Sequence, residues 1–379
     1  MAALPPQPPQ PPQPPQPPQP QASKPRRVRY PVREDQVDAI IEKVAYHRHE
    51  FCRSLIWFPP DTHKEIRHSI ATPFQRTFSE LGVGTLDRLP LELLHDVFYR
   101  LDMFSLFRFR QANLRARQLV DSSYEYRTVV TYGLNLLCAL LRTQLANYIR
   151  LSDFYDALCY RYCTLCHNFG GFMSLLPWRR CCFQCLHSRA EVKTQTLASA
   201  WREYDLNRSH LPALVSFKTI PGVYAMERDK DTAIMLLVAT THVQRLVGHP
   251  PLETLGTTDQ MTSERDARLG YLTSCALPHF DKKTRKAFYG LSCVACDRDL
   301  ADESRRQGGQ QAERMVRARG QVFGKMTFIR HFRKCAKAQR LWESTEERVG
   351  RPPALSPIPR ERMVTPGSEA RRAAGISYY

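Results

Sequence analysis

Four cysteines near the middle of the chain have the spacing of metal ligands. Cys163 and Cys166 form one C-x2-C pair, and Cys182 and Cys185 form a second pair after fifteen intervening residues. Each pair can direct two thiolates at one ion, and this separation is typical of a four-cysteine zinc ribbon. Four protein ligands leave no open coordination position for water or substrate. We therefore expect a structural zinc ion at this site.

Neighbouring residues offer alternative ligands. Cys181 can substitute for Cys182, and His167 or His187 can replace one thiolate. The alternative without metal is a set of four reduced, buried cysteines. We favour the metal because a structural zinc stabilises a small loop-rich unit by about 10 to 16 kcal/mol in apparent terms, and this segment has few apolar residues that could do so instead.

A second group of ligand residues lies nearer the C-terminus. Cys293 and Cys296 form a third C-x2-C pair, and His331 and Cys335 follow after a further thirty-four residues. Residues four apart lie on the same face of a helix, as two ligands on a zinc-finger helix do. The long interval requires an inserted loop or helix, and the alternative is a plain amphipathic helix without metal. The preferred interpretation gives the chain two structural zinc ions.

The composition narrows the class of protein. The 379 residues are 42% hydrophobic and carry a formal net charge of +18, which suits a folded chain with acidic partners. Cysteine pairs with metal spacing favour a reducing compartment, so we expect a cytoplasmic or nuclear protein. The N-terminal stretch lacks the apolar core of a secretory signal, and no apolar run is long enough for a membrane span.

The other cysteines do not form a catalytic motif. Cys52, Cys138, Cys159 and Cys275 lack a matching histidine and acidic residue of the kind that activates a cysteine nucleophile. We therefore expect that the chain is not an enzyme.

Three short helices are predicted between residues 86 and 127. The pair Leu89-Pro90 precedes the first helix, because proline suits a helix start. Asp102 separates the first helix from the second, and Asn113 can cap the third. The apolar positions of the three helices recur at helical spacing and are Leu94, Val97, Phe98 and Leu101, then Leu106, Phe107 and Phe109, then Leu114, Leu119 and Val120. Helices this short gain their stability from packing, so these faces must be buried against one another and against some other surface.

This run of helices resembles the F-box, the helical module through which substrate receptors join cullin-type ubiquitin ligases. The Leu-Pro opening, the middle LDMFSLFRFRQAN and the ending QLVDSSYEYR carry the resemblance. It implies a set of residues that dock on a Skp-type adaptor, namely Leu89, Pro90, Leu94, Phe98 and Leu106. The alternative is an ordinary amphipathic three-helix piece of an all-α domain.

Later segments resemble fungal F-box proteins in particular. The motif RCCFQCL at 180–186, the stretch LPALVSFKTIPGVY at 211–224 and the ending HFRKCAKAQRLW at 331–342 are similar to stretches of those proteins. The resemblance therefore implies one architecture that extends to Trp342.

The remaining pattern predicts further helices and one strand pair. Helical spacing of apolar residues predicts helices at 34–51, 129–146, 151–160, 191–204 and 233–247. Residues 214–220 and 223–226 are predicted strands around a turn at Pro221-Gly222, so we expect a hairpin there.

These predictions give a mainly α fold with small β and zinc-stapled segments. The expected order is a disordered proline- and glutamine-rich tract at 1–29, an N-terminal helical segment at 30–82, the F-box at 83–128, a helical linker at 129–160, a zinc ribbon at 161–190, an α+β segment at 191–280, a second zinc-binding segment at 281–345 and a disordered tail at 346–379.

The resemblance implies the function of a substrate-recognition subunit in an SCF-type cullin ubiquitin ligase. Its F-box would dock the Skp-type adaptor on a cullin scaffold, and its zinc-stapled remainder would hold an unknown target protein. The alternative is a zinc-dependent nucleic-acid-binding regulator, because residues 281–345 contain sixteen Lys or Arg against seven Asp or Glu.

Overall fold

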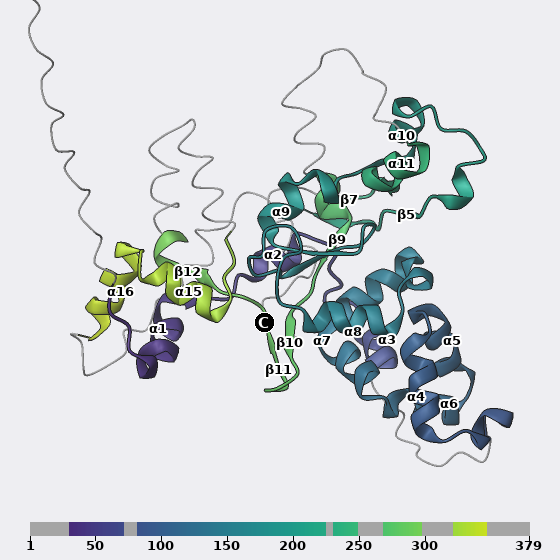
Figure 1. Ribbon diagram of the computed structural model, residues 1–379, viewed down its shortest axis with the longest axis horizontal. Helices are drawn as coiled ribbons and strands as arrows, with labels where there is room; N and C mark the ends of the chain where they lie inside the picture. The colour runs from purple at the N-terminus through teal and green to yellow at the C-terminus, as the bar shows by residue number, and fades with distance from the viewer. Residues whose placement is uncertain (1–29, 72–81, 225–229, 249–267, 298–320, 347–379) are drawn as a thin grey trace, which may run out of the picture.

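The computed structural model describes residues 30–71, 82–224, 230–248, 268–297 and 321–346 (Figure 1). Over these ranges the chain is mainly helical with short β-strands, as the sequence predicts. The proline- and glutamine-rich tract, the C-terminal tail and most of the insert between Cys296 and His331 lie outside the described residues.

The three predicted helices of the 86–127 run are present. Asp102 accepts hydrogen bonds from the backbone N–H groups of Phe104 and Ser105 and so caps the second helix, and Asn113 caps the third through the N–H of Ala116. The elements are the 3-10 turn η2 (Gly84–Arg88) and the helices α4 (Leu91–Arg100), α5 (Met103–Ala112) and α6 (Leu114–Ser122). Pro90 precedes the first turn of α4, where its missing N–H costs nothing.

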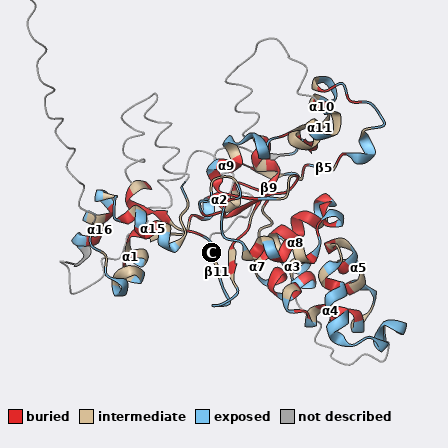
Figure 2. Cartoon of the chain, viewed as in Figure 1, coloured by how far each residue is buried: buried red, intermediate tan, exposed pale blue. Residues whose placement is uncertain are grey.

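A longer helix continues directly from this bundle. Ser123 caps α7 (Tyr124–Thr143), so that only one residue separates α6 from α7. Helix α7 packs against α3, α6 and α8, and its buried side joins the largest apolar core of the chain (Figure 2). The two other helices are α3 (Lys64–Ala71) and α8 (Leu151–Cys159), and the turn η3 (Leu145–Tyr148) lies between α7 and α8. The predicted helices at 129–146 and 151–160 are thereby confirmed.

Two small antiparallel sheets and a hairpin follow. Strands β3 (Arg179–Cys181), β2 (Phe172–Ser174) and β9 (Ser274–Ala276) form one sheet in that order, and β10 (His279–Asp281) pairs with β11 (Lys286–Phe288). Helix α9 (Phe183–Ser188) packs on the first sheet, and α2 (His49–Arg53) reaches it from the N-terminal side of the chain. The ring of Phe51 in α2 stacks on Phe183 with centroids 4.1 Å apart.

The second sheet corrects three predictions. Strand β5 (Ser216–Lys218) pairs with β8 (Leu236–Ala239), which also pairs with β4 (Thr194–Thr196). The predicted hairpin around Pro221-Gly222 is therefore wrong, because β5 finds a distant partner and β6 (Gly222–Val223) pairs with β7 (Lys230–Asp231). The predicted helices at 191–204 and 233–247 each contain a strand before the helical part, and the helical parts are α10 (Leu197–Glu203) and α11 (Thr240–Val247). The short turns η4 (Ala190–Val192) and η5 (Leu211–Ala213) complete this region.

The N-terminal helix packs against the C-terminal helices. Helix α1 (Val37–Val44) contacts α15 (Lys325–Phe332) and α16 (Ala336–Glu346), and β1 (Ala45–Tyr46) pairs with β12 (Ser292–Cys293). The single helix predicted over 34–51 is therefore wrong: the turn η1 (Glu34–Gln36), α1, β1 and α2 replace it. The chain leaves the helix at Ala45 because the backbone there pairs with Cys293.

Candidate docking surface and metal centres

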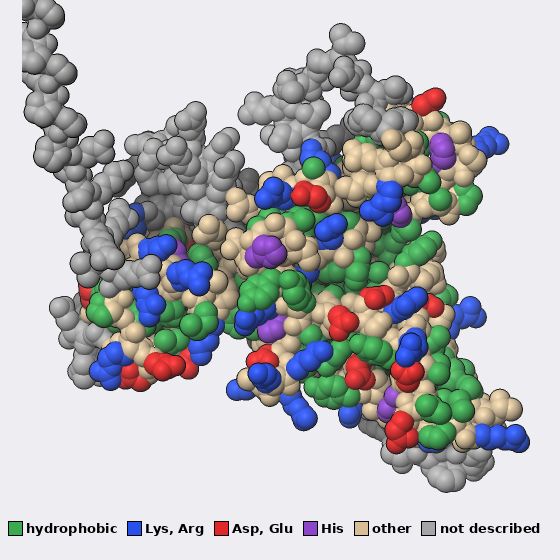
Figure 3. Space-filling model, viewed as in Figure 1, with side chains coloured by type: hydrophobic (Ala, Val, Ile, Leu, Met, Phe, Trp, Pro, Cys, Tyr) green, Lys and Arg blue, Asp and Glu red, His purple; other side chains and the backbone are tan. Residues whose placement is uncertain are grey.

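A strip of exposed apolar side chains lies on α4 and the turn before it. Its members are between 37% and 53% exposed and are Leu86, Leu89, Leu91, Leu93 and Val97. We call this set the α4 strip. Hydrophobic side chains are visible at the end of the molecule that carries α4 and α6 (Figure 3). Exposed apolar side chains grouped in this way are typical of a surface that contacts another protein.

Three of the five predicted docking residues lie inside the chain. Leu94, Phe98 and Leu106 are at most 4% exposed, so the prediction that they contact an adaptor is wrong. Leu94 and Phe98 are buried because α4 packs this face on α6 and α8, and the ring of Phe98 lies 5.4 Å from that of Phe109 in α5. Leu106 lies on α5, which packs on α6 and η3. Leu89 and Pro90 are at the surface, and their contact with an adaptor stays a prediction.

Sequence reasoning missed Leu91 and Leu93, although a signal for them was present. Helix α4 has apolar residues at 91, 93, 94, 97 and 98, which is more than one helical face can hold. The excess indicates a helix with one face packed inside the chain and another available to a partner. The structure shows that Leu94 and Phe98 lie on the packed face and that Leu93 and Val97 lie on the exposed face.

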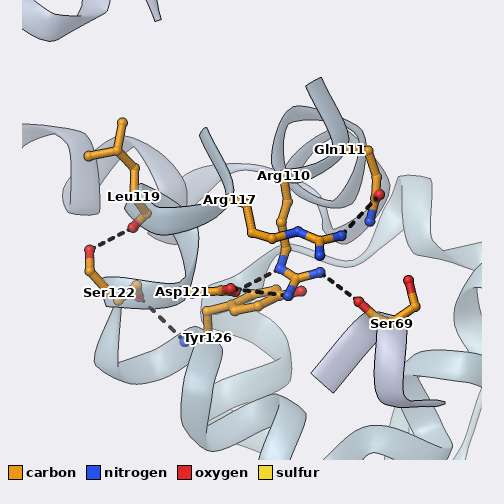
Figure 4. Close-up of polar contacts among 9 residues, drawn as sticks. Ser69, Arg110, Gln111, Arg117, Leu119, Asp121, Ser122 and Tyr126 are labelled. Atoms are coloured by element: carbon orange, nitrogen blue, oxygen red, sulfur yellow. Dashed lines mark hydrogen bonds and ion pairs between the residues drawn. The ribbon is translucent and has the colours of Figure 1, made fainter. Parts of the chain in front are cut away.

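A buried ion pair fixes the short helices to one another (Figure 4). The guanidinium of Arg110 in α5 donates to both carboxylate oxygens of Asp121 in α6, at 2.7 and 3.1 Å. It also donates to the backbone oxygen of Ser69 in α3 at 3.1 Å, and it lies 5.8 Å from the ring centre of Tyr126 in α7. Burial raises the pKa of the Tyr126 phenol to about 12, which Arg110 partly opposes. Helices α3, α5, α6 and α7 therefore meet at one charged group.

The first group of predicted metal ligands comes together. The four sulfur atoms of Cys163, Cys166, Cys182 and Cys185 all lie within 4.8 Å of one another, and those of Cys166 and Cys182 are 3.5 Å apart. A tetrahedral zinc ion binds sulfur at about 2.3 Å, which separates its ligand atoms by about 3.8 Å. The donor set and spacing therefore fit a four-thiolate zinc site.

Backbone geometry supports these thiolates. The sulfur of Cys163 accepts from the N–H of Leu165, and that of Cys182 caps α9 by accepting from the N–H of Cys185, both at 3.4 Å. Hydrogen bonds from Cys181 and Cys182 hold the pKa of the Cys163 thiol well below its usual range. Zinc binds the deprotonated form of all four cysteines, so metal binding at this site would release protons.

The structure also separates the alternative ligands. Cys181 is fully buried but lies outside the group of four, with its sulfur 3.6 Å from the backbone oxygen of Arg179. His167 is not in the group, and His187 packs its ring against Phe183 and Tyr271 instead. Of the adjacent residues Cys181 and Cys182, Cys182 is therefore the one that can complete the four-thiolate site.

The second group of predicted ligands comes together as well. The ligand atoms of Cys293, Cys296, His331 and Cys335 lie within 4.8 Å of one another. The sulfur of Cys296 is 3.5 Å from Nε2 of His331 and 3.7 Å from the sulfur of Cys335. The ring of Phe323 stacks on that of His331 with centroids 4.7 Å apart. This arrangement can hold a metal ion with one imidazole and three thiolates.

Charges and hydrogen bonds around this second site favour a bound cation. Burial alone would lower the pKa of His331, but the sulfurs of Cys293 and Cys335 outweigh it and raise the pKa to about 9. A metal ion that replaced the proton on the His331 ring would be attracted by the same thiolates. Next to the site, Asp297 forms a buried ion pair with Arg48 and accepts a hydrogen bond from the hydroxyl of Tyr46 at 3.0 Å. The N-terminal segment thus completes the surroundings of a C-terminal site, a contact that no local pattern reveals.

The comparison with protein families agrees with the helical bundle. Residues 86–128, which contain α4, α5 and α6, match the family model of the F-box domain. Searches of curated proteins and of solved structures found no match to this chain. Among the helices in the described ranges, none is both long and apolar enough to cross a bilayer.

Proposed function

We propose that this chain is the substrate-recognition subunit of an SCF-type cullin ubiquitin ligase. The observation that carries the proposal is the position of the α4 strip, which lies on the residues that match the F-box domain. F-box domains bind Skp-type adaptors, and an exposed apolar strip gains free energy when a partner removes it from water. The chain itself would do no bond chemistry, and its contribution would be to hold a target near the ubiquitin-conjugating enzyme.

The proposed docking residues are those of the α4 strip together with Pro90. Of these, Leu89 and Pro90 were already predicted from the sequence. Leu93 and Val97 lie four residues apart on α4, so they present one continuous apolar face. Aspartate at both positions would place two charges in the contact without entering the core of this chain.

A pull-down with a purified Skp-type adaptor tests this proposal. We expect the wild-type chain to retain the adaptor and the double variant Leu93→Asp, Val97→Asp to lose it. Met326→Asp is the matched control, because Met326 is 72% exposed and lies on α15, outside the F-box. Retention of the adaptor by the double variant, or its loss in the control, would contradict the proposal.

We further propose that two zinc ions hold the remainder of the chain, which would bind the target. The four-cysteine group and the Cys293, Cys296, His331, Cys335 group each supply a complete tetrahedral donor set. When bound, each ion would cross-link two segments that lie apart in the sequence.

Metal analysis of the purified chain tests this second part. We expect about two zinc ions per molecule in the wild-type chain, because it has two ligand groups. We expect about one zinc ion per molecule in Cys182→Ser. Cys181→Ser is the matched control and should keep both ions, since Cys181 is buried beside the group and not in it. A single ion in the wild-type chain, or equal loss in the two variants, would contradict this assignment.

The second candidate function is a zinc-dependent nucleic-acid-binding regulator. The observation that favours it is a basic surface on and just after α15, formed by Arg330, Arg333 and Lys334. Phosphate contacts of this kind weaken steeply with added salt. A gel-shift of DNA or RNA that disappears between low and physiological salt, from a chain that does not retain the adaptor, would favour this candidate over the ligase subunit.

A further inference from the structure

An apolar cavity of about 580 Å3 lies where the F-box meets the rest of the chain. Its walls come from the segment before α3, from α3 and α7, from Phe107 of the F-box helix α5, and from Ile220–Tyr224 next to β6. A volume of this size falls within the roughly 300 to 1,000 Å3 of typical small-molecule sites. The aliphatic and aromatic lining suits the apolar body of a ligand.

Two arginines add positive charge to this cavity. Arg67 of α3 and Arg142 of α7 both line it, Arg67 half-buried and Arg142 exposed, whereas neither Asp nor Glu is among its lining residues. Arg67 donates to the backbone oxygen of Phe58 at 3.3 Å and lies close enough to Cys138 to oppose the burial that raises the pKa of that thiol. Among the described residues, neither arginine forms an ion pair with a carboxylate.

The charge and the lining together define the chemistry of a ligand. A guanidinium that is half removed from water and has no acidic partner is stabilised by an anion that reaches it. Arginine is well suited to a carboxylate, because its donors match the two oxygens of that group. The remaining walls offer apolar contact and no negative charge.

We propose that this cavity binds a small organic acid, with its apolar body against the walls formed by α3 and α7 and its carboxylate paired with Arg67 and Arg142. Phe107 belongs to the F-box, and Ile220–Tyr224 belong to the segment that carries the second sheet. A bound acid would therefore contact both parts at once. The inference does not depend on adaptor binding, and its test needs no partner protein.

Calorimetric titration of the full chain with octanoate and with octanamide tests the proposed charge contact. These two probes share one apolar tail and differ in the charge of the head group. We expect saturable binding of one octanoate per chain and binding of octanamide at least about tenfold weaker, because a hydrogen bond to a charged group contributes about 1.5 to 3 kcal/mol. Equal affinity for the two probes, or the absence of saturable octanoate binding, would overturn the proposal.

Matched variants of α7 test the location. Arg142→Gln should weaken octanoate binding about tenfold or more and leave octanamide binding unchanged. Arg127→Gln is the control, because Arg127 lies on the same helix, is exposed and does not line the cavity. Trp57 lines the cavity, so octanoate should change tryptophan fluorescence in the wild-type chain and not in Trp57→Phe. Equal weakening of octanoate binding in the two arginine variants would place the ligand elsewhere and overturn the inference. The same would follow if Trp57→Phe showed as large a fluorescence change as the wild-type chain.

Discussion

At the scale of single residues, the buried ion pair between Arg110 and Asp121 joins the second and third helices of the F-box match, α5 and α6. The Arg110 side chain is fully buried and that of Asp121 is 15% exposed, so solvent screens their attraction only weakly. Arg110 also donates to Ser69 in α3. One side chain thus links α5 to the adjacent helix α6 and to α3, which lies well before them in the sequence.

Replacing this arginine should be costly for stability. We expect Arg110→Ala to lower the free energy of unfolding by about 3 to 5 kcal/mol, because it leaves the Asp121 carboxylate without its partner. Urea titration followed by circular dichroism measures this change. Arg100→Ala is the control: Arg100 pairs with Asp96 at the surface, and we expect no measurable shift of the midpoint. Similar midpoints for the two variants would contradict the role given to Arg110.

The role of a single residue could be predicted where the pattern that indicates it lies within a short stretch of sequence. The grouping of the eight candidate ligand residues could be predicted because metal spacing is visible within short stretches of sequence, and both groups come together in the structure. The docking residues could not be chosen in the same way. Leu93 and Leu94 are adjacent and equally apolar, and only the packing of α4 decides that Leu94 is buried and Leu93 is exposed.

At the scale of elements, helix predictions succeeded where periodicity and caps agree. Asp102 and Asn113 mark the starts of α5 and α6 in both sequence and structure. Predictions failed where a strand partner is distant, since β5 pairs with β8 and β1 pairs with β12. Pairing across such separations is set by the whole fold, and the residues around Ala45 carry no local sign of it.

The contact of α1 with the C-terminal helices leads to a prediction about metal binding. Ile40 of α1 is fully buried in the core that contains Phe328, Phe332 and Cys293. We expect Ile40→Ala to lose about 2 to 5 kcal/mol of packing in this core and to speed release of one of two zinc ions to a coloured chelator. Ile234→Ala is the control, because Ile234 is 65% exposed. Unchanged release, or equal acceleration for both ions, would show that α1 does not support the second site.

At the scale of the whole molecule, the F-box and the C-terminal helices lie at opposite ends of the long axis (Figure 1). Helices α4 and α6 occupy one end and α16 the other, with strands β9, β10 and β11 between them. An adaptor on the α4 strip would therefore leave the sheets and the second metal site accessible to a target. This separation suits a subunit that joins two partners, because each contact raises the local concentration of the other partner.

The most direct test of adaptor docking is hydrogen–deuterium exchange of the full chain with and without the purified Skp-type adaptor. We expect slower exchange in peptides covering residues 86–100, where the α4 strip lies, and unchanged exchange in peptides covering α15 and α16. Protection confined to α15 and α16, or no protection of residues 86–100 at saturating adaptor, would contradict docking through the F-box.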